Sequence, residues 1–321
     1  MNRQTSPEHT FHTPVLKNET LALLDPKPGG VYVDATLGGG GLAAEILERI
    51  GPDGLLIGID KDPEAIAYSE KRLAKYGSAA RIVRGDFRDL KSILASQGVS
   101  VIDGAVFDLG VSSRQLDSAR GFSFMRDEPL SMKMDPSSTG PDAADIVNTY
   151  SQDQLADLIR AFGEERYAKR IARAIVECRQ KQPITTTGQL VDVIVRAVGG
   201  AYKTQKIHPS TRTFLALRLV VNKELEAIEQ GLPAAIEALS EGGRVCVISF
   251  HSLEDRIVKT IMRRYAGKCV CPPAVLTCQC GAQKVVRVVT RKPVQPSEDE
   301  IRSNPRSRSA KLRCVEKLSS R

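Results

Sequence analysis

The sequence predicts an α/β protein: a doubly wound, seven-stranded sheet with an inserted all-helical domain. Three observations predict this fold class. Short apolar runs alternate with amphipathic helical stretches over the first third of the chain. From residue 112 to residue 206 there are several helical stretches and no convincing strand, and apolar strand patterns then return toward the C-terminus. Strands that alternate with helices form parallel sheets with right-handed crossovers, so the helical block interrupts one sheet domain.

The first third of the chain supplies the first half of the sheet. Asp62-Pro63 marks one helix start clearly, because proline is favoured at the first helical position. The expected strands are 31–35, 55–60, 80–85 and 101–108, and the expected helices are 41–50, 63–76 and 88–97.

The rest of the chain supplies the insertion and the closing strands. Helices are expected at 142–148, 151–162, 164–181 and 187–198, followed by a long helix over 210–230. A strand at 243–250, a helix at 252–265 and final strands at 284–290 and 310–317 complete the pattern. The predicted domains are 1–111 with 207–321 for the sheet, and 112–206 for the helical insertion.

A glycine-rich turn after the first strand indicates a nucleotide-like cofactor. The segment Val31–Gly41 reads as a buried strand and a tight turn, and the next strand ends in a carboxylate at Asp60. Glycines let the backbone approach a ligand, and Asp60 can accept hydrogen bonds from ribose hydroxyls. Gly38 to Ala43 also satisfies the dinucleotide pattern, so NAD and S-adenosylmethionine both fit the glycines.

Asp34 favours S-adenosylmethionine. Its carboxylate lies at the end of the first strand, where a dinucleotide would place two phosphates and be repelled. S-adenosylmethionine instead brings an ammonium and a sulfonium, which are both positive. A closing strand pair at the C-terminus also fits the methyltransferase variant of the doubly wound sheet better than a dehydrogenase.

The third and fourth strands end in further site candidates. Ligands lie beyond the carboxyl ends of parallel strands, so Phe87 is placed to stack on an adenine with Asp86 near its amino group. Asp108 ends the fourth strand, where the transferred methyl group should lie. A carboxylate there can orient a weakly nucleophilic aromatic amine and stabilise its developing charge, whereas a capping role is the structural alternative.

Composition limits the partners. The net charge of +8 and the pI near 9.1 favour a polyanion, and the last twenty residues are especially basic. No run approaches the ~18 apolar residues of a membrane span. Met1 to Thr13 is polar without an apolar signal core, so a cytoplasmic enzyme with no membrane partner is expected. The sequence leaves a homodimer open.

Several long motifs resemble one family. They are His12-Thr-Pro-Val, Asp108-Leu-Gly-Val-Ser-Ser113, Gly121–Arg126, Gly163–Arg173, His208–Phe214, Ser249–Arg256 and Asn304–Ser309. From about residue 9 to the C-terminus the chain resembles the ribosomal RNA small-subunit methyltransferase H family (RsmH/MraW). The resemblance implies S-adenosylmethionine-dependent methylation of the exocyclic N(4) amine of one cytidine in 16S rRNA, at the decoding centre of the small ribosomal subunit.

The resemblance also implies a set of cofactor contacts. Gln115 comes from the resemblance alone, whereas the other positions coincide with the residue chemistry above. Leu42 stands where the family often has histidine, so a backbone contact is expected there. The implied cofactor-binding residues are Gly40, Gly41, Leu42, Asp60, Phe87, Asp108 and Gln115, with Asp108 also catalytic.

A basic helix face is the main candidate for RNA contact. Over the expected helix 164–181, arginines recur at helical spacing opposite an apolar side, a pattern that is also typical of a solvated face. A lone histidine is more often a structural residue than a functional one, and this alternative applies to the histidine candidates. The RNA candidates are Arg166, Lys169, Arg170, Arg173, His208, Arg212 and His251.

Four of the seven cysteines form the pattern Cys269-x-Cys271-x6-Cys278-x-Cys280. Two Cys-x-Cys pairs can supply four thiolates to one structural zinc ion, although the usual knuckle spacing is C-x2-C. Free thiols and disulfides remain the alternatives. Two other function classes also remain: an NAD-dependent oxidoreductase, and an RNA-binding assembly factor with a vestigial cofactor site.

Overall fold

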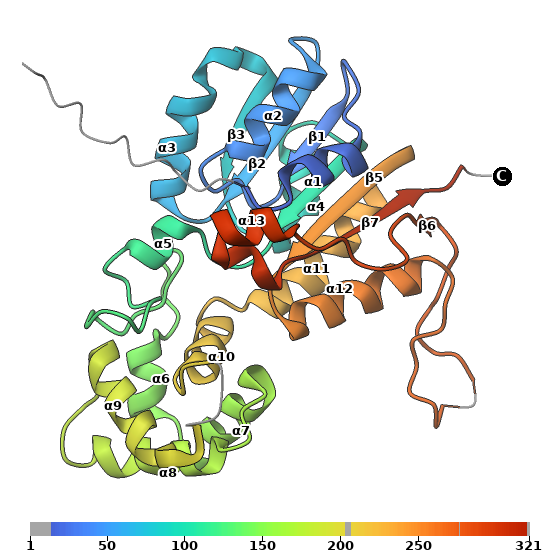
Figure 1. Cartoon of the computed structure of the whole chain (residues 1–321). Helices are drawn as coiled ribbons and strands as arrows, with labels where there is room; N and C mark the ends of the chain where they lie inside the picture. Colours follow the sequence, from blue (N-terminus) through green and yellow to red (C-terminus); the bar gives the residue numbers. More distant parts are fainter. Residues whose placement is uncertain (1–13, 203–206, 276, 320–321) are drawn as a thin grey trace, which may run out of the picture. The chain divides into compact units, whose positions relative to one another are not determined.

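The computed structural model describes residues 14–202, 207–275 and 277–319. The chain divides into two compact units (Figure 1). The first, here called the sheet unit, comprises Met1–Gly110 with Glu226–Arg321, and the second, the helical unit, comprises Val111–Leu225. The motif residues His12 and Thr13 lie outside the described residues.

The sheet unit contains the predicted seven-stranded sheet, with the order β3-β2-β1-β4-β5-β7-β6. The strands from β3 to β5 run parallel, whereas β7 pairs antiparallel with both β5 and β6. The α/β fold class is therefore confirmed, including the closing strand pair. The strands are β1 (Val31–Asp34), β2 (Leu55–Asp60), β3 (Ala80–Arg84), β4 (Ile102–Asp108), β5 (Leu239–Ser249), β6 (Val286–Val288) and β7 (Lys311–Lys317).

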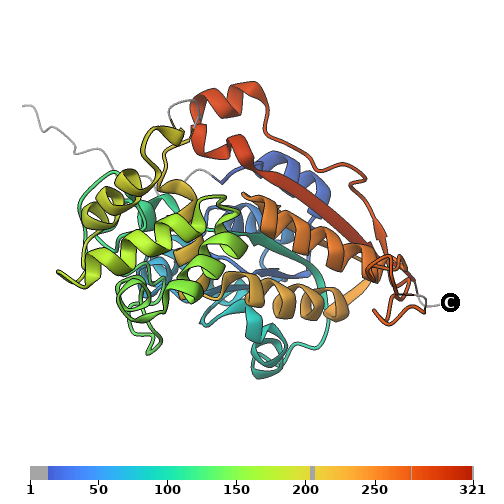
Figure 2. The ribbon, with the colours of Figure 1, turned by 90° about the horizontal axis from the view of Figure 1, so that it is seen from below.

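Both faces of the sheet are buried by helices. Along β5, Cys246 and Ile248 belong to a core shared with α1, α2 and α3, while the alternate residues Val245 and Val247 face the opposite layer. That layer is formed by α4, α11 and α12 (Figures 1 and 2). The helices are α1 (Lys17–Leu24), α2 (Gly41–Ile50), α3 (Pro63–Leu73), α4 (Leu90–Ser96), α11 (Glu224–Ala238), α12 (Ser252–Tyr265) and α13 (Glu298–Ser303).

The helical unit has its own apolar core. Phe214 and Leu217 of α10 are buried in this core with residues of α6 to α9, which explains why the unit extends to Leu225 rather than ending near residue 206 as the sequence predicted. Its helices are α5 (Ser113–Asp117), α6 (Ala143–Thr149), α7 (Gln152–Gly163), α8 (Ala168–Arg179), α9 (Thr187–Val198) and α10 (Thr211–Val221).

Two predicted helices are corrected. The expected helix 210–230 is interrupted at Lys223, whose φ of 50° is left-handed, so that α10 and α11 are separate. The expected helix 164–181 begins only at Ala168, because Glu164 ends α7 in a left-handed conformation with φ 50° and ψ 36°. Arg166 therefore precedes α8 and does not share its helical face with Arg170 and Arg173.

Within the described residues, no helix combines the length and apolar character required to cross a membrane.

Candidate active site

The glycine turn between β1 and α2 is a backbone cradle. Gly38 and Gly40 have φ of 49° and 66°, conformations that residues with a Cβ rarely adopt. Gly41 begins α2, and a Cβ there would lie 2.9 Å from the Cγ of Pro14. Outside the turn, the hydroxyl of Ser69 donates to the Gly38 carbonyl at 2.7 Å and fixes its position. The turn is therefore held in a defined shape at the carboxyl edge of the sheet, without side chains between its backbone and a ligand.

Asp60 fixes the same turn from the end of β2. One carboxylate oxygen accepts from the Gly38 amide at 2.8 Å, and the other accepts from the Asp62 amide at 2.9 Å. Burial raises the pKa of Asp60, an effect that these two amides oppose. Each carboxylate oxygen can accept a second hydrogen bond, so Asp60 retains capacity for a ligand.

Asp34 and Asp108 place two more carboxyl groups at this edge, on the neighbouring strands β1 and β4. Burial raises the pKa of Asp34 to about 7, and the Asp60 charge adds to the effect. Burial raises the pKa of Asp108 to about 8, with further contributions from the charges of Asp34 and Glu254. Without a bound cation, ionising all of these buried carboxyl groups costs free energy. This edge of the sheet therefore favours a positively charged ligand.

One carboxyl oxygen of Asp108, Oδ1, is buried without a hydrogen-bond partner among the described residues. The Asp108 amide donates to the Thr36 hydroxyl oxygen at 2.6 Å, which ties β4 to the start of the glycine turn. A buried acceptor without a partner costs about 1–3 kcal/mol, so its retention at the edge of a cofactor-type sheet indicates a ligand contact.

Asp86 and Phe87 follow β3 at the carboxyl edge of the sheet, as the sequence predicted, but the Asp86 carboxylate is engaged within the protein. Phe87 is half-buried, and its ring meets Phe107 edge to face at 5.5 Å. Asp86 is held by Lys61 at 3.2 Å and Arg88 at 3.1 Å, and these cations lower its pKa against the effect of burial. Phe87 thus remains the candidate for a stacking contact, whereas the Asp86 carboxylate serves to hold the turn.

Leu42 follows the glycines in α2. Its side chain is 5% exposed and belongs to the core beneath α1 and α2. Only its backbone is therefore available for a cofactor contact. Gln115 lies in the helical unit, where it forms a capping box with Ser112 at the start of α5.

Sequence reasoning did not assign Glu254, which the structure brings to this edge. Glu254 is 1% exposed and accepts from the Phe250 amide at 2.8 Å, and its charge raises the pKa of Asp108. His251 caps α12 by accepting from the Glu254 amide, and its Nε2 lies 3.0 Å from the Glu254 carboxylate. The spacing of a cap residue and a glutamate three positions later was the available sequence signal.

The remaining RNA candidates lie in the helical unit. His208 stacks on Phe124 with a centroid distance of 4.9 Å, and Arg212 pairs with the buried Glu165 at 3.8 Å. Arg166 lies over the ring of Tyr167 at 4.7 Å, and Arg173 pairs with Glu177 at 2.7 Å. Lys169 and Arg170 are exposed on α8 and form no ion pair within the described residues. Lys169 and Arg170 are therefore the two candidates that remain available for RNA contact, whereas the other candidates are engaged within the protein.

The sheet order, the antiparallel β7 and the acidic carboxyl edge define a doubly wound methyltransferase. The same chain matches the MraW methylase family over residues 9–318. It belongs to that family.

Curated relatives agree along nearly the whole length. The chain is 52% identical over 312 residues to the ribosomal RNA small subunit methyltransferase H of Trichlorobacter lovleyi, which covers 97% of this chain and 99% of the relative. It is 53% identical over 309 residues to the protein of the same name from Pelobacter propionicus, covering 96% and 98%. Among solved structures, an rRNA methylase from Streptococcus thermophilus aligns over 99% of this chain and 100% of its own, with 14% identity and a TM-score of 0.39.

Proposed function

We propose that this methyltransferase transfers a methyl group from S-adenosylmethionine to the exocyclic N(4) amine of one cytidine in 16S rRNA, at the decoding centre. The name that the relatives share, ribosomal RNA small subunit methyltransferase H, supports the substrate. The motif Asp108-Leu-Gly-Val-Ser-Ser113 and the other family motifs support the choice of the cytidine amine.

The observation that carries the proposal is Asp108. Its buried Oδ1 has no partner in the described part of the chain and lies at the end of β4, where an amine could donate to it. The cytosine amine is a weak nucleophile because its lone pair is delocalised into the ring. An acceptor that fixes the amine and stabilises the positive charge formed on the nitrogen lowers the barrier to methyl transfer.

The residues of the sheet edge fit the proposed cofactor. Asp34 and Asp60 suit a ligand with cationic and ribose groups, and the turn at Gly40 and Gly41 lets the ligand approach the backbone. Leu42 would contribute a backbone contact and Phe87 a ring contact, whereas Gln115 is assigned to the cofactor from the family motifs alone. When bound, S-adenosylmethionine supplies an electrophilic methyl group on sulfur.

Recognition of the RNA is assigned to cations of the helical unit, with Lys169 and Arg170 of α8 foremost. Secondary candidates, each of which already has a contact within the protein, are Arg166, Arg173, His208 and Arg212 of the helical unit and His251 of the sheet unit. Because the target base must leave its stack to be methylated, an RNA loop that is already open is the favoured substrate. A cytoplasmic setting with the small ribosomal subunit follows from this proposal.

The test is methyl transfer from labelled S-adenosylmethionine to small ribosomal subunits that lack the modification, followed by nucleoside analysis. The expected product is N(4)-methylcytidine at one position of 16S rRNA. Label in another nucleoside would overturn the assigned amine. Binding of the subunit without transfer would instead support an assembly factor with a vestigial cofactor site.

Calorimetry with S-adenosylmethionine and with NAD distinguishes the methyltransferase from the alternative, an NAD-dependent oxidoreductase. S-adenosylmethionine should bind, and NAD should not, because the Asp34 carboxyl group lies where NAD would place its phosphates and would repel them. Tight NAD binding would contradict the proposal.

A further inference from the structure

A long loop connects α12 to β6 and extends from the rest of the sheet unit (Figure 1). Its base is closed by an antiparallel bridge between Ala266 and Lys284, and the Val285 amide donates to the Tyr265 carbonyl at 2.9 Å. We call residues 267–283, which lie beyond this bridge, the cysteine loop. It contains Cys269, Cys271, Cys278 and Cys280.

The cysteine loop has no apolar core of its own. None of its described residues is buried, and Val275 is 36% exposed. Ordering a segment of this length costs conformational entropy that apolar burial here does not offset. Small elements without a core are usually stabilised by disulfides or by a bound metal.

The cysteines supply such a centre. All four Sγ atoms lie within 4.8 Å of one another, and those of Cys278 and Cys280 are 3.4 Å apart. In a tetrahedral zinc site with Zn–S bonds of about 2.3 Å, sulfur atoms are separated by roughly 3.8 Å. The cluster is therefore within a small adjustment of zinc geometry, although no two of these sulfurs are joined as a disulfide.

The backbone of each Cys-x-Cys pair supports the other pair. The Val270 amide, between the first two cysteines, donates to the Cys280 sulfur at 3.5 Å. The Gln279 amide, between the last two, donates to the Cys271 sulfur at 3.3 Å. The middle residue of each pair thus donates to the final cysteine of the other pair. Amides aimed at sulfur stabilise the thiolate form, which is the form that binds metal.

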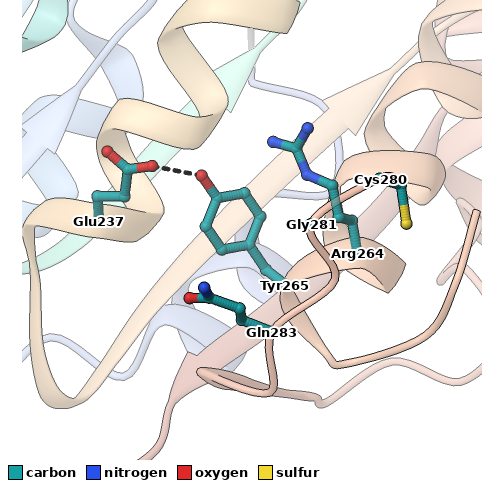
Figure 3. Close-up of a pocket in the computed structure, with 6 residues that line it drawn as sticks. All are labelled: Glu237, Arg264, Tyr265, Cys280, Gly281 and Gln283. Atoms are coloured by element: carbon teal, nitrogen blue, oxygen red, sulfur yellow. Dashed lines mark hydrogen bonds between the residues drawn. The ribbon is translucent and has the colours of Figure 1, made fainter. Parts of the chain in front are cut away.

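Cationic and polar groups surround the base of the loop. Figure 3 shows Cys280 lining a pocket with Arg264, Tyr265, Gly281 and Gln283, and the pocket has a volume of about 280 Å³. The Tyr265 hydroxyl donates to Glu237 across this pocket. Lys268 is an exposed cation of the cysteine loop. Arg264 lines the same pocket as Cys280 and Gly281 of this loop.

We propose that Cys269, Cys271, Cys278 and Cys280 bind one structural zinc ion that orders the cysteine loop. Four thiolates fill the tetrahedral coordination sphere and leave no position for a substrate, so the site is structural and separate from the carboxyl edge of the sheet. Zinc and iron both accept tetrahedral sulfur ligands, and the test must distinguish them.

The first experiment measures metal in the full-length protein, purified without oxygen or chelator. Elemental analysis should find about one zinc ion per chain, the number expected for one site with four thiolate ligands. Replacing zinc by cobalt should give the intense visible bands of tetrahedral thiolate coordination. A metal-free protein that also fails to take up zinc would overturn the proposal, and stoichiometric iron would overturn the choice of metal.

The second experiment uses paired variants. The double variant Cys278→Ser/Cys280→Ser should lose the zinc, whereas Cys178→Ser should retain it, because Cys178 packs in the helical unit. Retention of zinc by the double variant would refute the ligand assignment. Circular dichroism and S-adenosylmethionine binding check that the double variant remains folded.

Limited proteolysis tests the structural role. Cleavage after Lys268 should be roughly tenfold faster or more once zinc is removed, because the loop then lacks its cross-link. Equal cleavage rates with and without zinc would contradict an ordering role, even if zinc binds.

Discussion

The carboxylate of Asp60 accepts a hydrogen bond of 2.8 Å from the amide of Gly38. This contact joins the end of β2 to the glycine turn that follows β1, so one side chain both shapes the turn and faces the proposed ribose site. Loss of Asp60 should therefore affect the ligand and the shape of its cradle together.

Asp60→Ala is expected to weaken S-adenosylmethionine binding by about one hundredfold, since hydrogen bonds to a charged group contribute about 1.5–3 kcal/mol each. Calorimetry measures the change. Asp53→Ala is the matched control, because Asp53 is an exposed acid in the turn after α2. Equal affinity of wild type and Asp60→Ala would exclude a cofactor role for Asp60.

Asp108→Asn is expected to lower the rate of methyl transfer by about 10²-fold, while the affinity for the cofactor falls by a smaller factor. The amide keeps the size of the side chain but removes the negative charge that stabilises the reacting amine. Single-turnover kinetics with saturating substrate separates the two effects.

Asp89→Asn provides the control for charge removal, since Asp89 is exposed and its side chain caps no helix. If Asp108→Asn transferred the methyl group at the wild-type rate, Asp108 would have no role in the chemical step.

The carboxyl groups of the site predict how stability depends on pH. The pKa of Asp108 is raised to about 8 and that of Asp34 to about 7, compared with about 3.9 in an unfolded chain. The cofactor-free folded protein therefore holds protons that the unfolded chain releases. This contribution is fully present below about pH 4 and is lost as the pH rises to about 8.

Between pH 6 and pH 8 the cofactor-free protein should lose roughly 3–4 kcal/mol of unfolding free energy from these two groups. Urea denaturation at both pH values measures this loss. The Asp108→Asn variant should lose less over the same interval, because the amide that replaces the carboxyl group has no proton to release. An identical loss in both proteins would assign the dependence to other groups.

Local sequence patterns located much of the fold. The bounds of α2 and α12 agree with the sequence prediction at both ends, because glycines and a capping box mark them. The break between α10 and α11 was missed because its cause is tertiary. Asn222 accepts from the Met134 amide and donates to the Met132 carbonyl, both far away in sequence.

The candidate site shows the same division. Asp34, Asp60 and Asp108 could be predicted because the carboxyl ends of parallel strands share one edge. Glu254 could not be assigned, because its effect on Asp108 depends on the pairing of β4 with β5. The whole helical unit separates these two strands in the sequence. Likewise, sequence spacing could not show that Arg212 is engaged by Glu165, which is far from it along the chain. The pairing of Arg173 with Glu177 is an i,i+4 contact within α8, which helical spacing alone can indicate.

The two available cations of α8 give the final prediction. Lys169→Ala/Arg170→Ala should weaken binding to 16S rRNA in the small subunit and reduce the slope of log K against log salt by roughly 1.4–1.8, as expected for two lost phosphate contacts. Affinity measured over a series of salt concentrations gives this slope. The control is Arg49→Ala/Lys75→Ala, which removes the same charge from residues already paired with Glu45 and Glu48. If both double variants changed the slope equally, net charge alone would explain RNA binding, and α8 would have no specific part in it.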